Sequence, residues 1–170
     1  QYTLVGGAFD TDFERAVDFA KALELDPSRA YPNIDAFVAG ETALPADKRI
    51  EAVVVVTPNF LHYSMAKQLI QAGFHVICEK PVTNTAAEAI ELENLVNKHK
   101  VVFALTHTYT GYPMVRQMKS MIASGIIGDV HKVDAQYYQG WINPVIHDKE
   151  KRKEVWRLDP AKAGQSCCMG

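Results

Sequence analysis

Apolar residues in the first part of the chain form short runs, separated by stretches in which they repeat at helical spacing. The run from Tyr2 to Ala8 predicts a strand, and the spacing from Phe13 to Leu23 predicts a helix after it. The run from Ala52 to Val56 predicts a strand buried on both faces, as in parallel sheets. Two further strands are predicted at residues 74–78 and 101–105.

Helical stripes fill the gaps between these runs. A short helix is predicted from Ile34 to Val38, and a longer one carries Leu61 and ends at Gly73. Thr85, with Glu88 three residues later, has the spacing of a capping box and predicts the start of a third helix. Regular alternation of strands and helices predicts an α/β fold with a partial Rossmann-like, doubly wound parallel sheet.

The pattern changes near residues 113–125. A helix is predicted to end at Gly125, and residues 132–137 then alternate strictly between polar and apolar, which indicates a sheet with one solvated face. We therefore expect two domains. Residues 1–120 form a Rossmann-like dinucleotide-binding domain, and residues 121–170 begin an α+β domain with a largely antiparallel sheet.

Composition narrows the possible partners. The chain is 48% hydrophobic and 22% charged, with a net charge of -2, so nothing favours a nucleic-acid partner. Its apolar runs are too short to span a membrane, and the charged stretch 147–154 is typical of a solvated surface. Cys78, Cys167 and Cys168 have no metal-ligand spacing and indicate a reducing, cytoplasmic compartment, although a targeting signal upstream of Gln1 is compatible with the sequence.

Ligands of open parallel sheets bind beyond the carboxyl ends of the strands, so the residues after each run are candidates for binding. Asp10 follows the first run, where such folds place an acid that binds the adenosine ribose and favours NAD over NADP. Alternatively, it caps a helix. The glycine-rich phosphate loop should lie about 20 residues earlier, before Gln1, because Gly6 and Gly7 lack the required spacing.

Polar residues also follow the second and third apolar runs. Thr57, Pro58 and Asn59 form a turn that suits a ribose or nicotinamide, although Asn59 before a helix is also an ordinary cap. Lys80 lies between Glu79 and a proline that holds the backbone extended, so its ammonium group is expected at the ligand-binding edge. The alternative is a surface Glu-Lys pair at a turn.

The fourth run ends in a dense set of hydrogen-bond donors at residues 106–113. His107 is an acid-base candidate, or a hydrogen-bonded histidine packed under the domain junction. The histidines form no metal-like cluster. Tyr109, Tyr112, Tyr138 and Trp141 could stack on a sugar, although aromatic residues at a junction more often serve packing.

Three motifs in order resemble the Gfo/Idh/MocA family of oxidoreductases. They are Thr57-Pro58-Asn59 with His62, Glu79-Lys80-Pro81 one strand later, and Gly125-Ile126-Ile127-Gly128 before the second sheet. The stretch 156–160 with Gly164 is similar to the segment that leads into the family's catalytic Asp and His, which we expect beyond Gly170.

The resemblance implies an NAD(P)-dependent dehydrogenase that moves hydride to or from a hydroxyl or carbonyl carbon of a sugar, inositol or related polyol, and that is a homo-oligomer in full-length form. Lys80 would position the substrate and polarise its oxygen. The residues implied to line the cofactor are Asp10, Thr57, Pro58, Asn59, His62, Glu79, Lys80 and Thr108. Without the phosphate loop and the catalytic histidine, residues 1–170 alone should bind cofactor poorly and turn over little.

Two other functions are also compatible with the sequence. One is a nicotinamide-binding sensor or regulatory protein that keeps the fold without catalysis. The other is a self-contained α/β domain that binds a different nucleotide.

Overall fold

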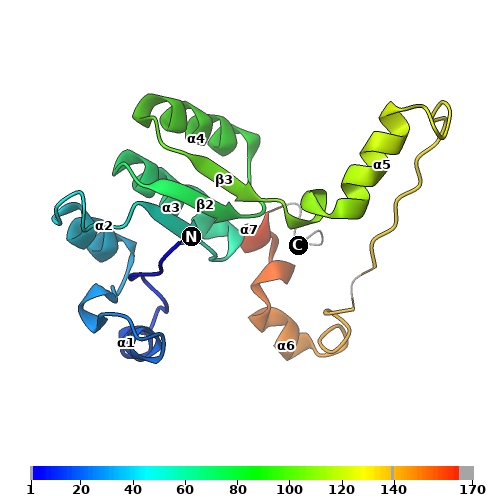
Figure 1. The fold of residues 1–170 in the computed structure, drawn as a ribbon. Helices are drawn as coiled ribbons and strands as arrows, with labels where there is room; N and C mark the ends of the chain where they lie inside the picture. The colour runs from blue at the N-terminus through cyan, green and yellow to red at the C-terminus, as the bar shows by residue number, and fades with distance from the viewer. Residues whose placement is uncertain (1, 139, 165–170) are drawn as a thin grey trace.

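A parallel three-stranded sheet lies at the centre of the computed structural model, which describes residues 2–138 and 140–164 (Figure 1). Its strands are β1 (Ala52–Val55), β2 (His75–Glu79) and β3 (Phe103–Thr106), in the order β1-β2-β3. The strands lie in register, so that their carboxyl ends meet at one edge. The predicted parallel α/β architecture is confirmed.

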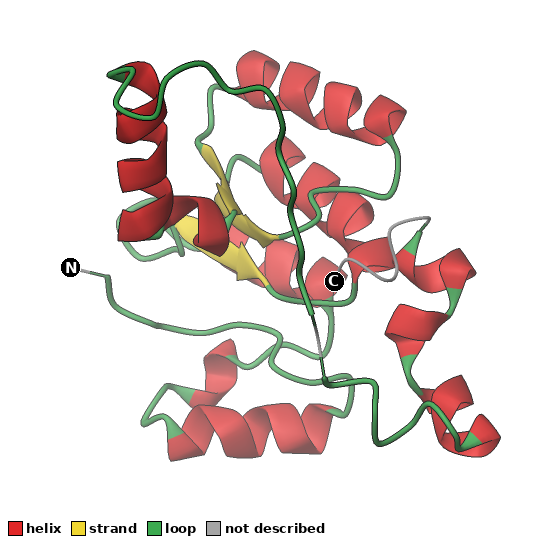
Figure 2. Ribbon diagram, turned by 90° about the vertical axis from the view of Figure 1, so that its right-hand side faces the viewer, coloured by secondary structure: helices red, strands yellow, loops and turns green. Residues whose placement is uncertain are grey.

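Two helices connect these strands. Helix α3 (Asn59–Gln71) joins β1 to β2, and α4 (Ala86–His99) joins β2 to β3. Helix α3 lies on both β1 and β2 and also packs against α4 (Figure 2). The predicted capping box opens α4, because the Thr85 hydroxyl accepts from the Glu88 N–H and the Glu88 carboxylate accepts from the Thr85 N–H.

The core lies between the sheet and α3. Its most deeply buried side chains are Val55, Ala66, Leu69, Ile70, Phe74, Val76 and Cys78. The other side of β1 is open in the described part of the chain, where Val54 is 57% exposed and Val56 is 69% exposed. The prediction that Ala52 to Val56 is buried on both faces is therefore wrong for these residues, because β1 is an edge strand with a helix on one face only.

The predicted strand from Tyr2 to Ala8 is also wrong. This segment makes a single bridge, in which the Gly7 N–H donates to Arg29 O at 3.0 Å and the Tyr31 N–H donates to Gly7 O at 3.0 Å. A Cβ added at Gly6 would lie 2.7 Å from Arg29 O, so the close approach requires a glycine. An apolar run alone does not make a strand. The backbone N–H and C=O groups along its length must also pair with another strand.

Three helices follow this segment: α1 (Phe13–Ala22), the 3-10 helix η1 (Pro27–Arg29) and α2 (Ile34–Thr42). The Asp12 carboxylate caps α1, and the Asn33 side chain caps α2. Both predicted helices in this region are confirmed.

A fully buried carboxylate, Glu41, ties this region to the sheet. It accepts hydrogen bonds from Arg29 Nε at 3.0 Å, Arg29 Nη2 at 2.6 Å, the Tyr31 hydroxyl at 2.7 Å and the Ile50 N–H at 2.8 Å. Burial alone raises the pKa of Glu41, but these hydrogen bonds outweigh it and hold the pKa below its usual value. We call Glu41, Arg29, Tyr31 and Ile50 the Glu41 cluster.

Beyond β3 the chain forms short helices. They are η2 (Thr108–Gly111), α5 (Pro113–Ala123), α6 (Lys149–Glu154), η3 (Trp156–Leu158) and α7 (Pro160–Ala163). Helix α5 projects away from the sheet, and residues 129–138 contain no strand, so the antiparallel sheet predicted there is not confirmed (Figure 1). Helix α6 accounts for the charged stretch and is exposed, as predicted.

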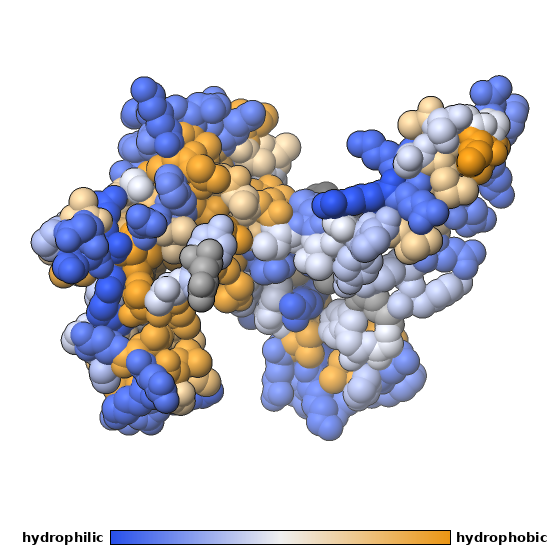
Figure 3. Space-filling view, viewed as in Figure 1, coloured by the Kyte–Doolittle hydropathy of each residue, from blue (hydrophilic) through white to orange (hydrophobic). Residues whose placement is uncertain are grey.

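Apolar side chains remain on the surface in several places (Figure 3). One band covers the part of the molecule that contains the sheet, and a smaller patch lies on α5 at the upper right. Residues on α5 and just after it with large exposed apolar side chains include Met114, Met118, Ile122, Ile126 and Ile127.

Within the described residues, every helix is too short or too polar to cross a membrane. That part of the chain also contains no group of three His, Cys, Asp or Glu side chains placed to hold a metal ion. Cys167 and Cys168 lie outside the described residues, whereas Cys78 is a buried free thiol.

Candidate functional site

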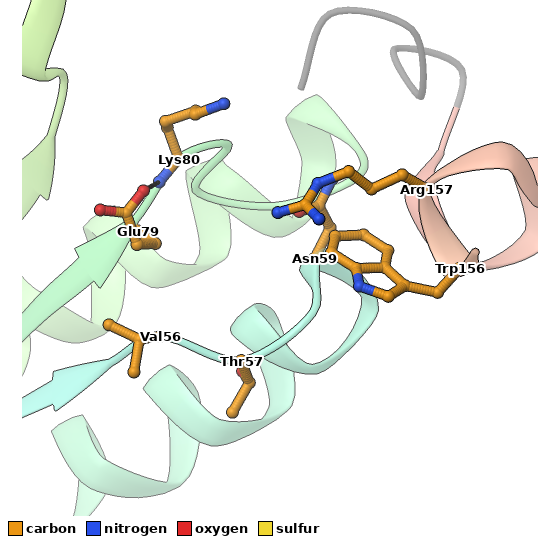
Figure 4. Close-up of a pocket in the computed structure, with 7 residues that line it drawn as sticks. All are labelled: Val56, Thr57, Asn59, Glu79, Lys80, Trp156 and Arg157. Atoms are coloured by element: carbon orange, nitrogen blue, oxygen red, sulfur yellow. Dashed lines mark hydrogen bonds between the residues drawn. The ribbon is translucent and has the colours of Figure 1, made fainter. Parts of the chain in front are cut away.

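A small cavity of about 170 Å³ lies at the carboxyl ends of β1 and β2 (Figure 4). It is lined by Val56, Thr57, Asn59, Glu79, Lys80, Trp156 and Arg157. Glu79 and Lys80 lie on one side of it, and Asn59, Trp156 and Arg157 lie on the other. Four of the sequence-predicted site residues are thus brought together, namely Thr57, Asn59, Glu79 and Lys80.

The turn after β1 presents Thr57 and Asn59. Pro58 is the N-cap of α3 and no side chain caps this helix, so the alternative role of Asn59 as a helix cap is wrong. Asn59 is instead the first residue of the helix, and its buried amide donates to Ala163 O at 3.3 Å. Its side chain therefore joins the strand end to the C-terminal segment.

The turn after β2 presents Glu79 and Lys80. The peptide bond from Lys80 to Pro81 is cis, and the Lys80 N–H donates to the Glu79 carboxylate at 3.2 Å. Both residues are half-buried, so their side chains lie at the cavity and not in open solvent. A half-buried ammonium group at this position can donate hydrogen bonds to a ligand oxygen.

His62 does not line the cavity. Its side chain is fully buried below it, with Nδ1 at 2.7 Å from Pro81 O and Nε2 at 2.8 Å from Thr57 O. The cofactor contact that the family resemblance implied for His62 would require an exposed ring atom. The ring instead lies between the two turns.

The thiol of Cys78 lies one residue before Glu79 and faces the core. Burial, and secondarily the Glu79 charge, raise the pKa of Cys78 to about 11. The nucleophile of thiol chemistry is the thiolate, so Cys78 is a packing residue at neutral pH.

Trp156 and Arg157 complete the cavity from η3. The Arg157 guanidinium lies 4.6 Å from the centroid of the Trp156 ring. The short helix α7 holds this segment in place, because Asn59 binds Ala163 O and the Asn84 amide donates to Lys162 O at 3.3 Å. An aromatic residue next to an arginine was the available signal in the sequence, but nothing local indicated which strand end they would meet.

Asp10 does not line this cavity. One oxygen of its carboxylate accepts from the Asp12 N–H at 3.0 Å, and the other lies 3.2 Å from Arg15 Nη2. The Asp12 hydrogen bond is the main reason that the pKa of Asp10 is lowered, and Arg15 contributes further. Asp12 is the cap of α1, so Asp10 itself has no helix-capping role.

Two further predicted residues lie outside the cavity lining. Thr108 begins η2 and is exposed. His107 is exposed just before it, and its carbonyl accepts from the Thr110 hydroxyl at 2.7 Å, so it is not packed under a junction in the described part of the chain. The neighbouring tyrosines contact one another, with the Tyr137 hydroxyl donating to the Tyr109 hydroxyl at 3.0 Å.

Comparison with known proteins identifies the family that this chain matches. The sequence profile of Gfo/Idh/MocA, described as an oxidoreductase family with an NAD-binding Rossmann fold, matches residues 2–107. The uncharacterized oxidoreductase YfiI of Bacillus subtilis is 40% identical over 169 residues, which cover 99% of this chain and 42% of YfiI.

Solved structures agree. An inositol dehydrogenase homolog from Azotobacter vinelandii, crystallised with NAD+, superposes with a TM-score of 0.85 at 36% identity, over 96% of this chain and 41% of that one. A structure of an inositol dehydrogenase homolog from the same organism, with NADH and myo-inositol, gives 0.72 at 37% identity, over 75% of this chain and 33% of that one. The chain thus spans about two fifths of the length of YfiI and of the first of these structures.

Proposed function

This chain belongs to the Gfo/Idh/MocA oxidoreductase family, and from that premise we propose that it forms part of an NAD(P)-dependent dehydrogenase acting on a sugar, inositol or related polyol. The observation that carries the proposal is the convergence of Lys80, Asn59 and Thr57 on one cavity at the carboxyl ends of parallel strands. A relative crystallised with NADH and myo-inositol supports the substrate class.

The lining residues fit the nicotinamide end of a dinucleotide. Val56 and the Trp156 indole offer apolar surface for a flat ring. Around them, Thr57, Asn59 and Lys80 supply donors, and Glu79 supplies an acceptor for ribose hydroxyls. A bound nicotinamide would accept or donate the hydride, and the protein would orient it and provide the electrostatic environment.

In this proposal Lys80 positions the substrate and is not the catalytic base. Its ammonium group donates a hydrogen bond to the reacting oxygen of the alcohol or ketone. Negative charge on that oxygen grows as the carbon–oxygen bond is polarised, so a fixed positive charge stabilises the transition state more than the ground state.

The remaining predicted residues have supporting roles in this proposal. Asp10 binds the adenosine ribose, with NAD as the preferred cofactor. Pro58 shapes the turn between Thr57 and Asn59, and Thr108 lies at the third strand end, where it would meet the cofactor from the side of β3.

We also propose the predicted division into a dinucleotide-binding domain, residues 1–120, and the beginning of a second domain, residues 121–170. The departure of α5 from the sheet supports it (Figure 1). The exposed apolar side chains on α5 and just after it are consistent with burial against a second copy in a homo-oligomer.

The test replaces Lys80 by methionine in the natural full-length polypeptide and measures hydride transfer from nicotinamide absorbance. The assay supplies NAD+ or NADP+ together with myo-inositol or another polyol. We expect kcat to fall by about 100-fold to 1,000-fold, because one donor placed against a developing negative charge contributes on this scale. Lys98→Met is the matched control, because Lys98 is an exposed lysine on α4 and should leave kcat unchanged.

Near-normal turnover in Lys80→Met would refute the role of Lys80. A wild-type protein that binds NADH but reduces or oxidises no polyol would instead favour the nicotinamide-binding sensor. Absence of any nicotinamide binding would exclude both.

A further inference from the structure

His62 has an unusual hydrogen-bonding environment. Its side chain is fully buried in the first turn of α3, and both ring nitrogens face main-chain carbonyl oxygens. Nδ1 lies 2.7 Å from Pro81 O, and Nε2 lies 2.8 Å from Thr57 O. Both distances lie within the range for N–H···O hydrogen bonds.

A carbonyl oxygen accepts hydrogen bonds and cannot donate them. A neutral imidazole has one N–H and one nitrogen lone pair, so its second nitrogen would direct a lone pair at a carbonyl oxygen in close contact. The imidazolium form has two N–H donors and satisfies both carbonyls. Either form of the ring donates to at least one of the two carbonyls, and the ring lies between both.

The two carbonyls belong to the two turns that form the cavity. Thr57 follows β1, and Pro81 follows Lys80 at the end of β2. The ring therefore connects the turn that presents Asn59 to the turn that presents Lys80.

Carboxylates on the surrounding elements do not pair with this ring. None of the ion pairs in the described part of the chain includes His62. Glu79 accepts from the Lys80 N–H, Glu88 binds Thr85, and Glu91 binds Lys67. The hydrogen-bonding contacts described for the ring are therefore those to the carbonyls of the two turns.

We propose that His62 is a positioning residue that cross-links the turns carrying Asn59 and Lys80 and so fixes the width of the cavity. It acts through those residues and does not contact the cofactor. The cross-link is independent of the proposed function, and only its catalytic consequence rests on that function.

The direct test is nuclear magnetic resonance on protein with nitrogen-15 in the histidine rings, near neutral pH and without cofactor. We expect His62 to have a ring N–H that exchanges slowly with water, because it donates to a carbonyl of one of the two turns. The signal is assigned by its disappearance in His62→Gln. A ring N–H of His62 that exchanges as fast as that of the exposed His131 would overturn the proposal, whatever the enzyme activity.

A double-mutant cycle tests the positioning role. We expect His62→Gln to lower kcat by about 100-fold, because a small displacement of a reacting group can cost that much, and to change KM less. In a protein that already carries Lys80→Met, adding His62→Gln should have little further effect, because both changes remove the same contribution. The exposed His131 provides the control variant, His131→Gln.

Fully additive effects of His62→Gln and Lys80→Met would show that His62 does not act through Lys80. If His62→Gln fails to fold, the resonance measurement on the wild-type protein still decides whether the ring donates to a turn carbonyl. Failure of the proposed function would be recognised separately, as absence of hydride transfer in the wild type.

Discussion

Two groups of charged residues in this chain use similar chemistry for different purposes. In the Glu41 cluster, the carboxylate is fully buried and accepts four hydrogen bonds from Arg29, Tyr31 and Ile50. At the cavity, Glu79 and Lys80 are only half-buried and line an open space with Arg157. The Glu41 cluster is closed to ligands, whereas the cavity residues remain accessible to one.

This difference distinguishes a charged side chain that stabilises the fold from one that can act on a ligand. A buried charge is tolerated when every polar atom around it has a partner, and its removal then leaves those partners unsatisfied. A charge at a cavity can be reached by a ligand. Glu41 should therefore control stability, and Lys80 should control turnover.

The largest expected effect on stability is that of Glu41→Ala. This change leaves the Arg29 guanidinium, the Tyr31 hydroxyl and the Ile50 N–H without their shared acceptor. We expect the free energy of unfolding to fall by about 3 kcal/mol, as found when one partner of a buried ion pair is removed. Urea unfolding measures it, with Glu93→Ala as the control, because Glu93 is an exposed residue on α4.

If Glu41→Ala and Glu93→Ala destabilise the protein equally, the cluster is not the anchor that its geometry indicates. A fall in kcat as large as that of Lys80→Met, without loss of stability, would remove the distinction between the two groups.

Acid should weaken the same cluster by a smaller amount. The pKa of Glu41 is lower in the folded chain than its usual value, so the folded state favours the carboxylate. The resulting stability is fully present above the pKa of an unfolded glutamate, near 4.3, and is lost as the pH falls toward and through the folded pKa. Urea unfolding of wild type and Glu41→Gln across this pH range should therefore give two stabilities that converge at low pH. A difference that stays constant from pH 6 downward would contradict this assignment.

The sequence predicted the sheet well where the signal was local. The apolar runs that became β1 and β2, and the Thr85 and Glu88 capping box, each depend on residues within a few positions of one another. The segment from Tyr2 to Ala8 had the same local signal but pairs only through Gly7 with the segment around Ala30. Whether an apolar run becomes a strand depends on a partner elsewhere in the chain.

The residues of the candidate site also differ in whether the sequence could predict them. Thr57, Asn59 and Lys80 could be predicted because parallel strands place their carboxyl ends at one edge. Trp156 and Arg157 could not, because their position depends on α7 docking through Asn59, a contact over 104 residues of sequence. His62 was predicted as a cofactor contact because its motif gives its place in sequence and not its burial.

Asp10 is intermediate between the two groups and gives the smallest expected effect. One of its oxygens is used by the Asp12 N–H, and the other is shared with the exposed Arg15, so a ribose hydroxyl would compete with Arg15 for it. Asp10→Asn should weaken NADH binding by about tenfold, as for loss of one hydrogen bond to a charged group. It should weaken NADPH binding less, because removing a negative charge favours a 2′-phosphate, for which Arg15 is a ready partner.

Fluorescence titration of the full-length protein with NADH and with NADPH measures the ratio of the two affinities, and Asp47→Asn serves as the control at an exposed aspartate. Arg15→Ala should move the ratio the other way, by weakening NADPH alone. An unchanged ratio in both variants would place Asp10 with the Glu41 cluster, as a charge committed to the fold. A changed ratio would place it with Lys80, because only a carboxylate that exchanges its protein partner for a ligand can select between the two cofactors.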